Sequence, residues 1–234
     1  MKKIVCTGLM LFALASFSFG QNLLKEYGYS VYGGVSLSSL EKDTVSSSSI
    51  PGFHLGVAVE IPVSGRFSIQ PGVELSLKGA KINRWKITGV KEITLMDSEN
   101  NPYTQIVPDT ATAIFQRGVT ERLLYLQMPI LAYYHFEVGS GKFFVAGGPY
   151  GACGVYSRAS EKDEEDRRAW FYATEYGKFD LGLQLKAGYE LPSGWFFSLG
   201  YDMGLLNIAN NGLYNDKAKN RSILFTIGRK VWGN

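Results

Sequence analysis

The fold of this chain is decided by residues 178–207, KFDLGLQLKAGYELPSGWFFSLGYDMGLLN. The first half of this stretch places apolar side chains at odd positions, and small, polar or charged ones at even positions. Because successive side chains of a β-strand point to opposite faces, the pattern predicts a strand with one apolar and one polar face. Pro192-Ser193-Gly194 predicts a turn, after which Trp195–Leu205 repeats the alternation. The glycines among the polar positions suit a narrow barrel interior as well as a solvent-exposed surface. This hairpin alone therefore does not determine which face meets water.

The same alternation recurs throughout the chain and predicts eight strands. The predicted strands are residues 27–37, 52–62, 66–78, 122–137, 142–156, 178–191, 195–205 and 219–232. The glycine-rich fifth strand has no clear apolar face. Pro71 and Pro129 lie inside two strands, and because proline cannot donate to a strand ladder, we expect a bulge or a local break at each.

The connections between these strands alternate between long and short. In order they are residues 38–51, 63–65, 79–121, 138–141, 157–177, 192–194 and 208–218. This sorting places all short turns at one rim and all long loops at the other, as in membrane barrels with short periplasmic turns and longer extracellular loops. The sequence therefore predicts an all-β, eight-stranded, antiparallel, up-and-down transmembrane β-barrel whose apolar faces meet lipid. The long outer loop 79–121 itself contains alternating segments at 86–96 and 110–120, so we expect it to extend the neighbouring strands as a hairpin.

The N-terminus has the pattern of a secretory signal peptide. Lys2 and Lys3 precede an apolar run up to Phe19, and small residues stand at Ser18 and Gly20. We expect cleavage after Gly20, which leaves residues 21–234 as a single barrel domain in the outer membrane of a Gram-negative cell.

Composition excludes several classes of function. The net charge of +3 argues against nucleic acid as the partner. Cys153 is the one cysteine after cleavage, so no intramolecular disulfide and no cysteine metal cluster is expected. No phosphate-binding loop, hydrolase elbow or zinc-protease motif occurs. We therefore expect no catalytic residue, no metal and no cofactor.

Charged residues on the inward positions form the best candidate site. We expect an interior polar cluster drawn from a wider set of inward charges that also holds Glu60, Lys78 and Asp180. The residues assigned to the cluster are Arg66, Glu74, Lys186, Glu190 and Asp202. An eight-stranded barrel is just wide enough for its side chains to fill it, so these charges form either a paired plug, which we expect, or a narrow polar path.

The remaining polar candidates give weaker signals. His54 and His135 lie on inward positions near opposite ends of the predicted barrel, so a shared metal or catalytic site is not expected. The charged run Glu161–Arg168 lacks the ligand spacing of a calcium loop, and we expect a solvated loop there.

Several phrases resemble a known family. They are FSIQPGVELSLKGA at 67–80, LLYLQMPILAYYHF at 123–136, AGGPYGA at 146–152, FDLGLQLKAGYEL at 179–191, YDMGLLNIAN at 201–210 and NRSILFTIGRKV at 220–231. Together they are similar to the outer-membrane β-barrel proteins of the porin-like, PorT-type family. The resemblance covers almost the whole mature chain, and that family shares no catalytic motif. The chain departs from it in the long 79–121 insertion and in its end, where Trp232 is followed by Gly233 and Asn234.

From these patterns we expect a monomeric, non-enzymatic membrane protein with outer-membrane lipid as its main partner. Its outer loops, especially 79–121, would carry any recognition. The open alternatives are a subunit of an outer-membrane secretion or transport machinery with other envelope proteins as partners, a narrow porin, a lipid-modifying outer-membrane enzyme using His54, and a soluble periplasmic binding barrel.

Overall fold

A computed structural model of the chain describes residues 27–42, 47–96, 102–160, 167–170, 178–209 and 217–232. The predicted signal peptide lies outside the described residues, as does 161–166 of the charged loop run. No described helix is long and apolar enough to cross a membrane.

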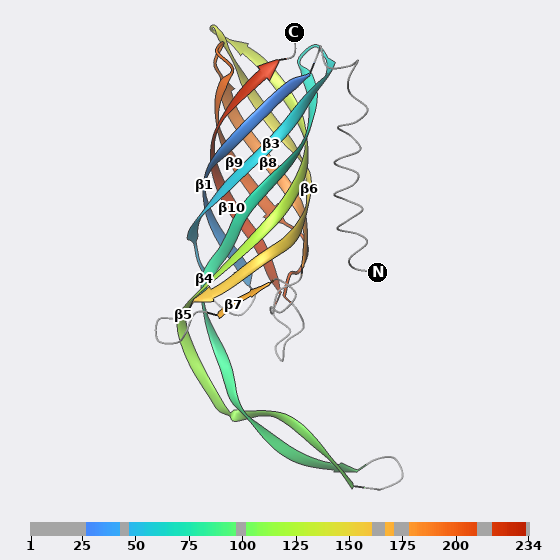
Figure 1. The fold of residues 1–234 in the computed structure, drawn as a ribbon, viewed down its shortest axis with the longest axis vertical. Coiled ribbons are helices and arrows are strands. Elements are labelled where there is room, and N and C mark those ends of the chain that lie inside the picture. Colours follow the sequence, from blue (N-terminus) through green and yellow to red (C-terminus); the bar gives the residue numbers. More distant parts are fainter. Residues whose placement is uncertain are drawn as a thin grey trace.

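Ten strands make up the described structure (Figure 1). They are β1 (Gly28–Lys42), β2 (Ser47–Ser48), β3 (Ile50–Ser64), β4 (Phe67–Met96), β5 (Pro102–Val138), β6 (Gly141–Ser160), β7 (Arg167–Trp170), β8 (Phe179–Glu190), β9 (Trp195–Gly204) and β10 (Ala218–Trp232). Eight of them form a closed antiparallel ring in the order β1-β3-β4-β5-β6-β8-β9-β10, and β2 and β7 are short additions to β4 and β6.

Closure of the ring depends on the ladder between the first and last strands. β1 pairs with β10 from Gly28 opposite Trp232 to Lys42 opposite Ala218. The pairing of β4 with β5 completes the circle. Closure leaves no open strand edge within the barrel wall. A sheet that crosses a membrane needs this, because hydrocarbon cannot hydrogen-bond to unpaired backbone groups. The predicted eight-stranded antiparallel barrel is confirmed.

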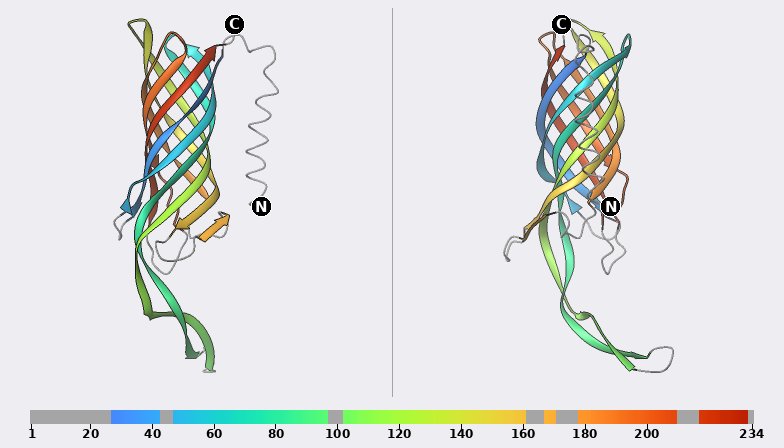
Figure 2. Two further views of the ribbon diagram at one scale, coloured as in Figure 1. Left: turned by 60° about the vertical axis from the view of Figure 1, so that its left-hand side comes forward. Right: turned by 45° about the vertical axis from the view of Figure 1, so that its right-hand side comes forward.

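The loop asymmetry is also present. Tight turns at Gly65–Arg66, Gly139–Ser140 and 191–194 lie at one end, which we call the short-turn rim (upper end in Figure 1). Gly65, Gly139 and Gly194 have φ values of 46°, 64° and 82°, a backbone conformation that favours glycine. The strand ends that the long connections join lie at the opposite end, the long-loop rim (Figure 2).

The apolar faces of the strands point outward. On β8, Leu181, Leu183 and Leu185 are exposed, whereas Asp180, Gln184 and Lys186 are buried. β6 follows the same rule, because Phe144, Ala146, Tyr150 and Ala152 are buried and Phe143 and Val145 are exposed. A register shift opposite Leu124 and Tyr125 then moves Ser157 to the inside. This shift and the small residues explain why the facing of the fifth strand could not be read from its sequence.

The two mid-strand prolines interrupt pairing without shifting register. The β3–β4 ladder has no pairing between Ala58–Gly72 and Ile61–Ile69, a gap that includes Pro71. The β4–β5 ladder has a similar gap on the β5 side at Pro129. Both ladders resume with the same register, so the predicted local break is present and the alternative, a bulge, is wrong.

β4 and β5 continue far beyond the barrel wall. They pair from Phe67 opposite Tyr134 to Met96 opposite Pro102, so most of the predicted loop 79–121 is a hairpin. We call the part beyond Ile82 and Val119 the arm; it projects from the long-loop rim and bends along its length (Figures 1 and 2). Register shifts between Ile82 and Arg84 and between Ile87 and Gly89 accompany this course.

Candidate functional site

Three of the five residues assigned to the interior cluster lie together in the middle of the barrel. Glu74 on β4 and Asp202 on β9 are fully buried, and Lys186 on β8 is 8% exposed. Because alternate residues of each strand face inward, three strands deliver these side chains to one level of the lumen.

Asp202 is the centre of this interior network. Its carboxylate accepts hydrogen bonds from Lys78 at 2.9 Å, Gln184 at 2.7 Å and Gln127 at 3.2 Å. Lys78 is itself 1% exposed. A buried carboxylate with three donors, one of them a cation, is compensated for the loss of water.

Two further acids are held close to this centre. Lys186 Nζ lies 3.9 Å from Glu74 Oε2 and 4.9 Å from the ring centroid of Tyr32. Asp180 accepts hydrogen bonds from Tyr150 at 3.1 Å and from Asn220 at 2.8 Å. The central network therefore contains three acids and two lysines that are engaged mainly with one another and with neutral donors.

Glu190, the fourth predicted residue, belongs to a separate network at the short-turn rim. Lys230 Nζ lies 2.6 Å from both Glu190 Oε2 and Glu60 Oε2. The other oxygen of Glu60 lies 2.7 Å from His135 Nε2 and accepts a hydrogen bond from Ser68 at 2.6 Å. These five residues form the rim network.

Arg66, the fifth predicted residue, is not in the interior. It lies in the turn between β3 and β4 and is exposed. The prediction began the third strand one residue too early, so the alternation was extended into the turn. Arg66 lies instead at the mouth of a recess above the rim network, together with Glu137 and Lys142.

The two histidines lie in different surroundings. His54 is buried, and its Nε2 lies 3.0 Å from Thr226 Oγ1, so it cannot reach lipid or the outer rim. This overturns the placement of His54 at the outer rim, because its strand begins at Ile50 and carries it into the lumen. At the rim, Ser68 and Glu60 both contact the same nitrogen of His135, whereas a triad needs them on different nitrogens.

No metal-binding set of three or more histidine, cysteine or acidic side chains is present in the part of the chain that the structure describes.

Two apolar layers separate and cap these networks. The first lies between the central and rim networks and consists of Tyr32, Ala58, Leu131, Tyr133, Phe144, Ala146 and Phe196. On β5, for example, Leu131 and Tyr133 stand between Gln127 and His135. We call this the aromatic layer.

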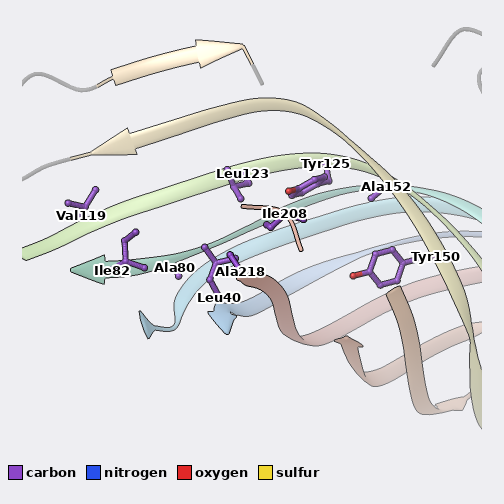
Figure 3. Close-up of a cluster of buried hydrophobic side chains, with 10 residues drawn as sticks. All are labelled: Leu40, Ala80, Ile82, Val119, Leu123, Tyr125, Tyr150, Ala152, Ile208 and Ala218. Carbon is purple, nitrogen blue, oxygen red and sulfur yellow. The ribbon is translucent and has the colours of Figure 1, made fainter. Parts of the chain in front are cut away.

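The second layer lies toward the long-loop rim and is called the apolar cap (Figure 3). It consists of Leu40, Ala80, Ile82, Val119, Leu123, Tyr125, Tyr150, Ala152, Ile208 and Ala218. Ile208 comes from the connection after β9, and its N–H donates to Ala218 at 2.9 Å. The described interior thus holds two apolar clusters beside its polar networks, and Tyr150 joins the apolar cap to the central network by donating to Asp180. Glu121 is also buried, between Val119 and Leu123 of the cap on β5.

Inward glycines make room for the rings that fill the lumen. A Cβ on Gly56 would come within 2.6 Å of Tyr32 Cζ, and one on Gly182 within 2.5 Å of Tyr150 Cζ. Ordinary carbon contacts are longer, so neither position accepts a side chain without movement of a ring.

Sequence reasoning missed Lys230, Gln127 and Gln184 as members of the networks. All three stand on the inward parity of their strands, which was a signal that could have found them. The two glutamines carry no charge, so a search for inward charges does not find them. Lys230 stands between the exposed Arg229 and Val231, and only the alternation shows that it points inward.

The arm is the second candidate site. Its bend is held by side chains, since Thr112 Oγ1 accepts a hydrogen bond from Gly89 N at 2.8 Å and donates one to Asp109 O at 2.7 Å. Asp109 also accepts from Ala111 N at 3.2 Å. Beyond this bend, Val90 is 71% and Ile106 65% exposed.

Comparison with solved structures gives low similarities over most of the chain. Ail, the attachment invasion locus protein of Yersinia pestis, is 11% identical with a TM-score of 0.41, covering 88% of this chain and 99% of its own. Neisserial surface protein A is 13% identical with a TM-score of 0.43, covering 87% and 96%. OprG from Pseudomonas aeruginosa is 14% identical with a TM-score of 0.38, covering 89% and 97%. Values this low carry no statement about function.

No curated protein matches the sequence. The family described as outer membrane protein beta-barrel domain matches residues 18–210 of the 234 residues. A match over this much of the chain, together with the closed ring and its apolar outer face, makes the chain an integral outer-membrane β-barrel protein. It belongs to the outer membrane protein beta-barrel domain family.

Proposed function

We propose that this protein is a non-enzymatic scaffold in the outer membrane, with a sealed barrel that presents the arm outside the cell for recognition. The observation that carries the proposal is the contrast between a lumen filled by successive side-chain layers and a hairpin that continues beyond it. The rule that long loops of bacterial barrels are extracellular assigns the arm to the outside.

The filled lumen supports an anchoring role over a porin. A solute crossing the barrel would have to pass the apolar cap, the central network and the aromatic layer in turn. Steady conduction needs a continuous polar path that a hydrated ion can follow, and hydrophobic constrictions oppose it.

The arm supports recognition because it is long and structured. It continues strands of 30 and 37 residues, and its bend is fixed by the bonds of Asp109 and Thr112. A site on paired strands is better positioned than one on a loop without secondary structure.

Two measurements test the proposal. Reconstituted protein should show no steady current in a planar bilayer. Trypsin added to intact cells should cleave the arm, where Lys91 is 52% exposed, and leave the barrel intact. A steady current would contradict the sealed scaffold, and protection of the arm on intact but not on lysed cells would place it on the wrong side.

A matched control comes from the register. Ile82 lies opposite Val119, so Asn-Gly in place of residues 83–118 closes the strands with a two-residue turn. This armless variant should fold, shown by heat-modifiable migration, and should lose the cleavage.

A subunit of a secretion machinery is the alternative that the arm also supports, because a projecting ribbon can dock on other envelope proteins. Purification of a stable, stoichiometric complex that the armless variant loses would favour this role.

A further inference from the structure

The distal arm, residues 89–96 of β4 paired with 102–109 of β5, is a ribbon of two strands. Among the described residues, the outer edge of β4 pairs with β2 at Lys81 and Ile82, and beyond Ile82 β4 pairs with β5 alone. The outer side of β5 has described partners only from Thr120 onward. Each strand of the distal arm therefore presents an edge of backbone donors and acceptors.

The two edges differ in what they can bind. β5 carries Pro102 and Pro108, which lie opposite Met96 and Val90. Proline has no N–H, and within a sheet it is tolerated where that N–H would face away from the ladder. Both prolines therefore mark even-numbered residues as the outward-pointing ones on β5, and two of the four outward donors of this edge are missing.

The same register identifies the outward groups of β4. Residues directly opposite in an antiparallel pair either both bond inward or both point outward. The partners of the even β5 residues are Val90, Glu92, Thr94 and Met96. All four have an N–H, so the edge of β4 keeps a complete row of donors and acceptors.

The distal arm also exposes apolar side chains that a further strand would cover. Val90, Met96 and Ile106 are exposed on one face, and Tyr103 is exposed on the other. A ribbon of two strands is marginal in water, and a third strand stabilises it by extending the ladder and covering side chains on both faces.

We propose that the outer edge of β4 at residues 89–96 binds an extended segment of another protein as a third strand. This inference rests on the proposed function of the arm and names the kind of partner that it takes. Charge complementarity defines the segment further, since Lys91 and Glu92 point to opposite faces of the same edge strand. Lys91 Nζ lies 3.9 Å from Asp109 Oδ1 of β5, and its side chain is still 52% exposed toward a further strand. The segment carries an acidic side chain on the Lys91 face, a basic one on the Glu92 face, and apolar or β-branched residues around them.

The probe for this edge is a fluorescent ten-residue peptide that alternates threonine and valine around a central Glu-Lys step. It is added to the full-length protein in lipid nanodiscs, and binding is followed by fluorescence anisotropy. Amide hydrogen exchange is measured in parallel. Bound peptide should protect the amides of Val90, Glu92 and Thr94, and should leave those of Thr104 and Ile106 unchanged.

Two proline variants at directly opposite positions form a matched pair. Thr94→Pro removes an outward donor from the β4 edge, and Thr104→Pro removes one from the β5 edge, while neither removes a bond between the two strands. Thr94→Pro should weaken peptide binding about tenfold or more, since strand addition there loses a ladder bond and meets the ring. Thr104→Pro should leave the affinity within about twofold of the unsubstituted protein, a change of less than half a kcal/mol.

A second peptide separates backbone pairing from side-chain binding. N-methyl groups on alternate residues block one edge of the peptide, and shifting them by one residue blocks the other edge. One of the two methylated peptides should lose binding and the other should keep it.

Several outcomes would overturn the inference: no peptide binding, equal loss in Thr94→Pro and Thr104→Pro, protection along β5 in place of β4, or self-association of the protein through this edge. The scaffold proposal is judged separately by bilayer current and by cleavage on intact cells. If both of those hold and strand addition does not occur, the inference about the β4 edge fails alone. If the arm is inaccessible on intact cells, the scaffold proposal fails and the result for the edge still stands.

Discussion

Lys78 on β4 and Asp202 on β9 meet across the lumen, with Nζ 2.9 Å from Oδ2. In the ring of eight strands β4 and β9 are four places apart in either direction, so this ion pair joins opposite walls of the barrel. Both side chains are essentially inaccessible to solvent, and Gln127 and Gln184 complete the coordination of the carboxylate.

Lys78→Met should destabilise the barrel by about 3–5 kcal/mol, because it leaves the Asp202 carboxylate buried without its cation. The double variant Lys78→Met/Asp202→Leu should recover much of this loss, since no buried charge is then stranded. Urea unfolding in lipid vesicles, followed by heat-modifiable migration, measures both. Lys91→Met on the exposed arm is the control and should change stability by no more than about 0.5 kcal/mol. Equal stability of the Lys78 variant and the unsubstituted protein would show that the pair is dispensable.

Lys230→Met should be similarly damaging at the short-turn rim. One ammonium group lies 2.6 Å from both Glu60 and Glu190, so its removal leaves two carboxylates facing each other. Adding Glu190→Gln should restore part of the stability, because it removes the repulsion. The matched control is Lys142→Met, which changes an exposed lysine at the mouth of the same recess. The same unfolding assay applies, and a larger effect of Lys142→Met would refute the assignment.

Gly56→Ala should cost about 1–3 kcal/mol, since the added methyl group would lie 2.6 Å from Tyr32 Cζ and force the ring to move. Tyr32→Leu should relieve this cost in the double variant, although it has a cost of its own. Gly151→Ala is the control, because a Cβ there meets no atom within 4 Å. The yield of heat-modifiable barrel and the unfolding midpoint report the result. Additive costs for Gly56→Ala and Tyr32→Leu would argue against a steric contact.

Removal of either apolar layer alone should not open the barrel, since the two layers close the lumen in series. Tyr133→Ala/Phe144→Ala thins the aromatic layer, and Leu40→Ala/Leu123→Ala thins the apolar cap. We expect a steady current in planar bilayers from the combined variant alone, provided that heat-modifiable migration shows it to be folded. A current from either double variant would mean that one layer forms the whole seal.

The wall of the barrel could be predicted from the sequence because its information is local. The alternation through Leu181–Leu185 and the sorting of short and long connections can both be read from one sequence. Together they predicted that the barrel is closed and that the apolar side chains face outward. The inward face of the glycine-rich β6 could not be predicted in this way. The positions of β6 that point inward change at a register shift opposite Leu124 and Tyr125, which no local sequence pattern reveals.

The arrangement of side chains in the lumen was harder to predict from the sequence. Inward parity assigned Glu74, Lys186 and Asp202 to the interior, and all three are buried there. Parity does not give the level along the barrel axis at which each side chain lies. That level depends on the stagger of all eight strands, so parity alone could not separate Glu190 from the central network or pair Lys78 with a strand on the opposite wall. Arg66 was misplaced for a simpler reason, since a turn residue can continue the alternation of the strand next to it.

The arm is mechanically coupled to the barrel, because β4 and β5 are also strands of the barrel wall. A pull on the arm acts lengthwise along β4 and β5. β4 pairs with β3 from Phe67 to Ser76, and β5 pairs with β6 from Thr120 to Val138. Such a force loads these ladders in shear, so many ladder bonds resist it together. Tension on the arm therefore passes directly into the barrel wall, and the arm should stay attached until the barrel itself unfolds.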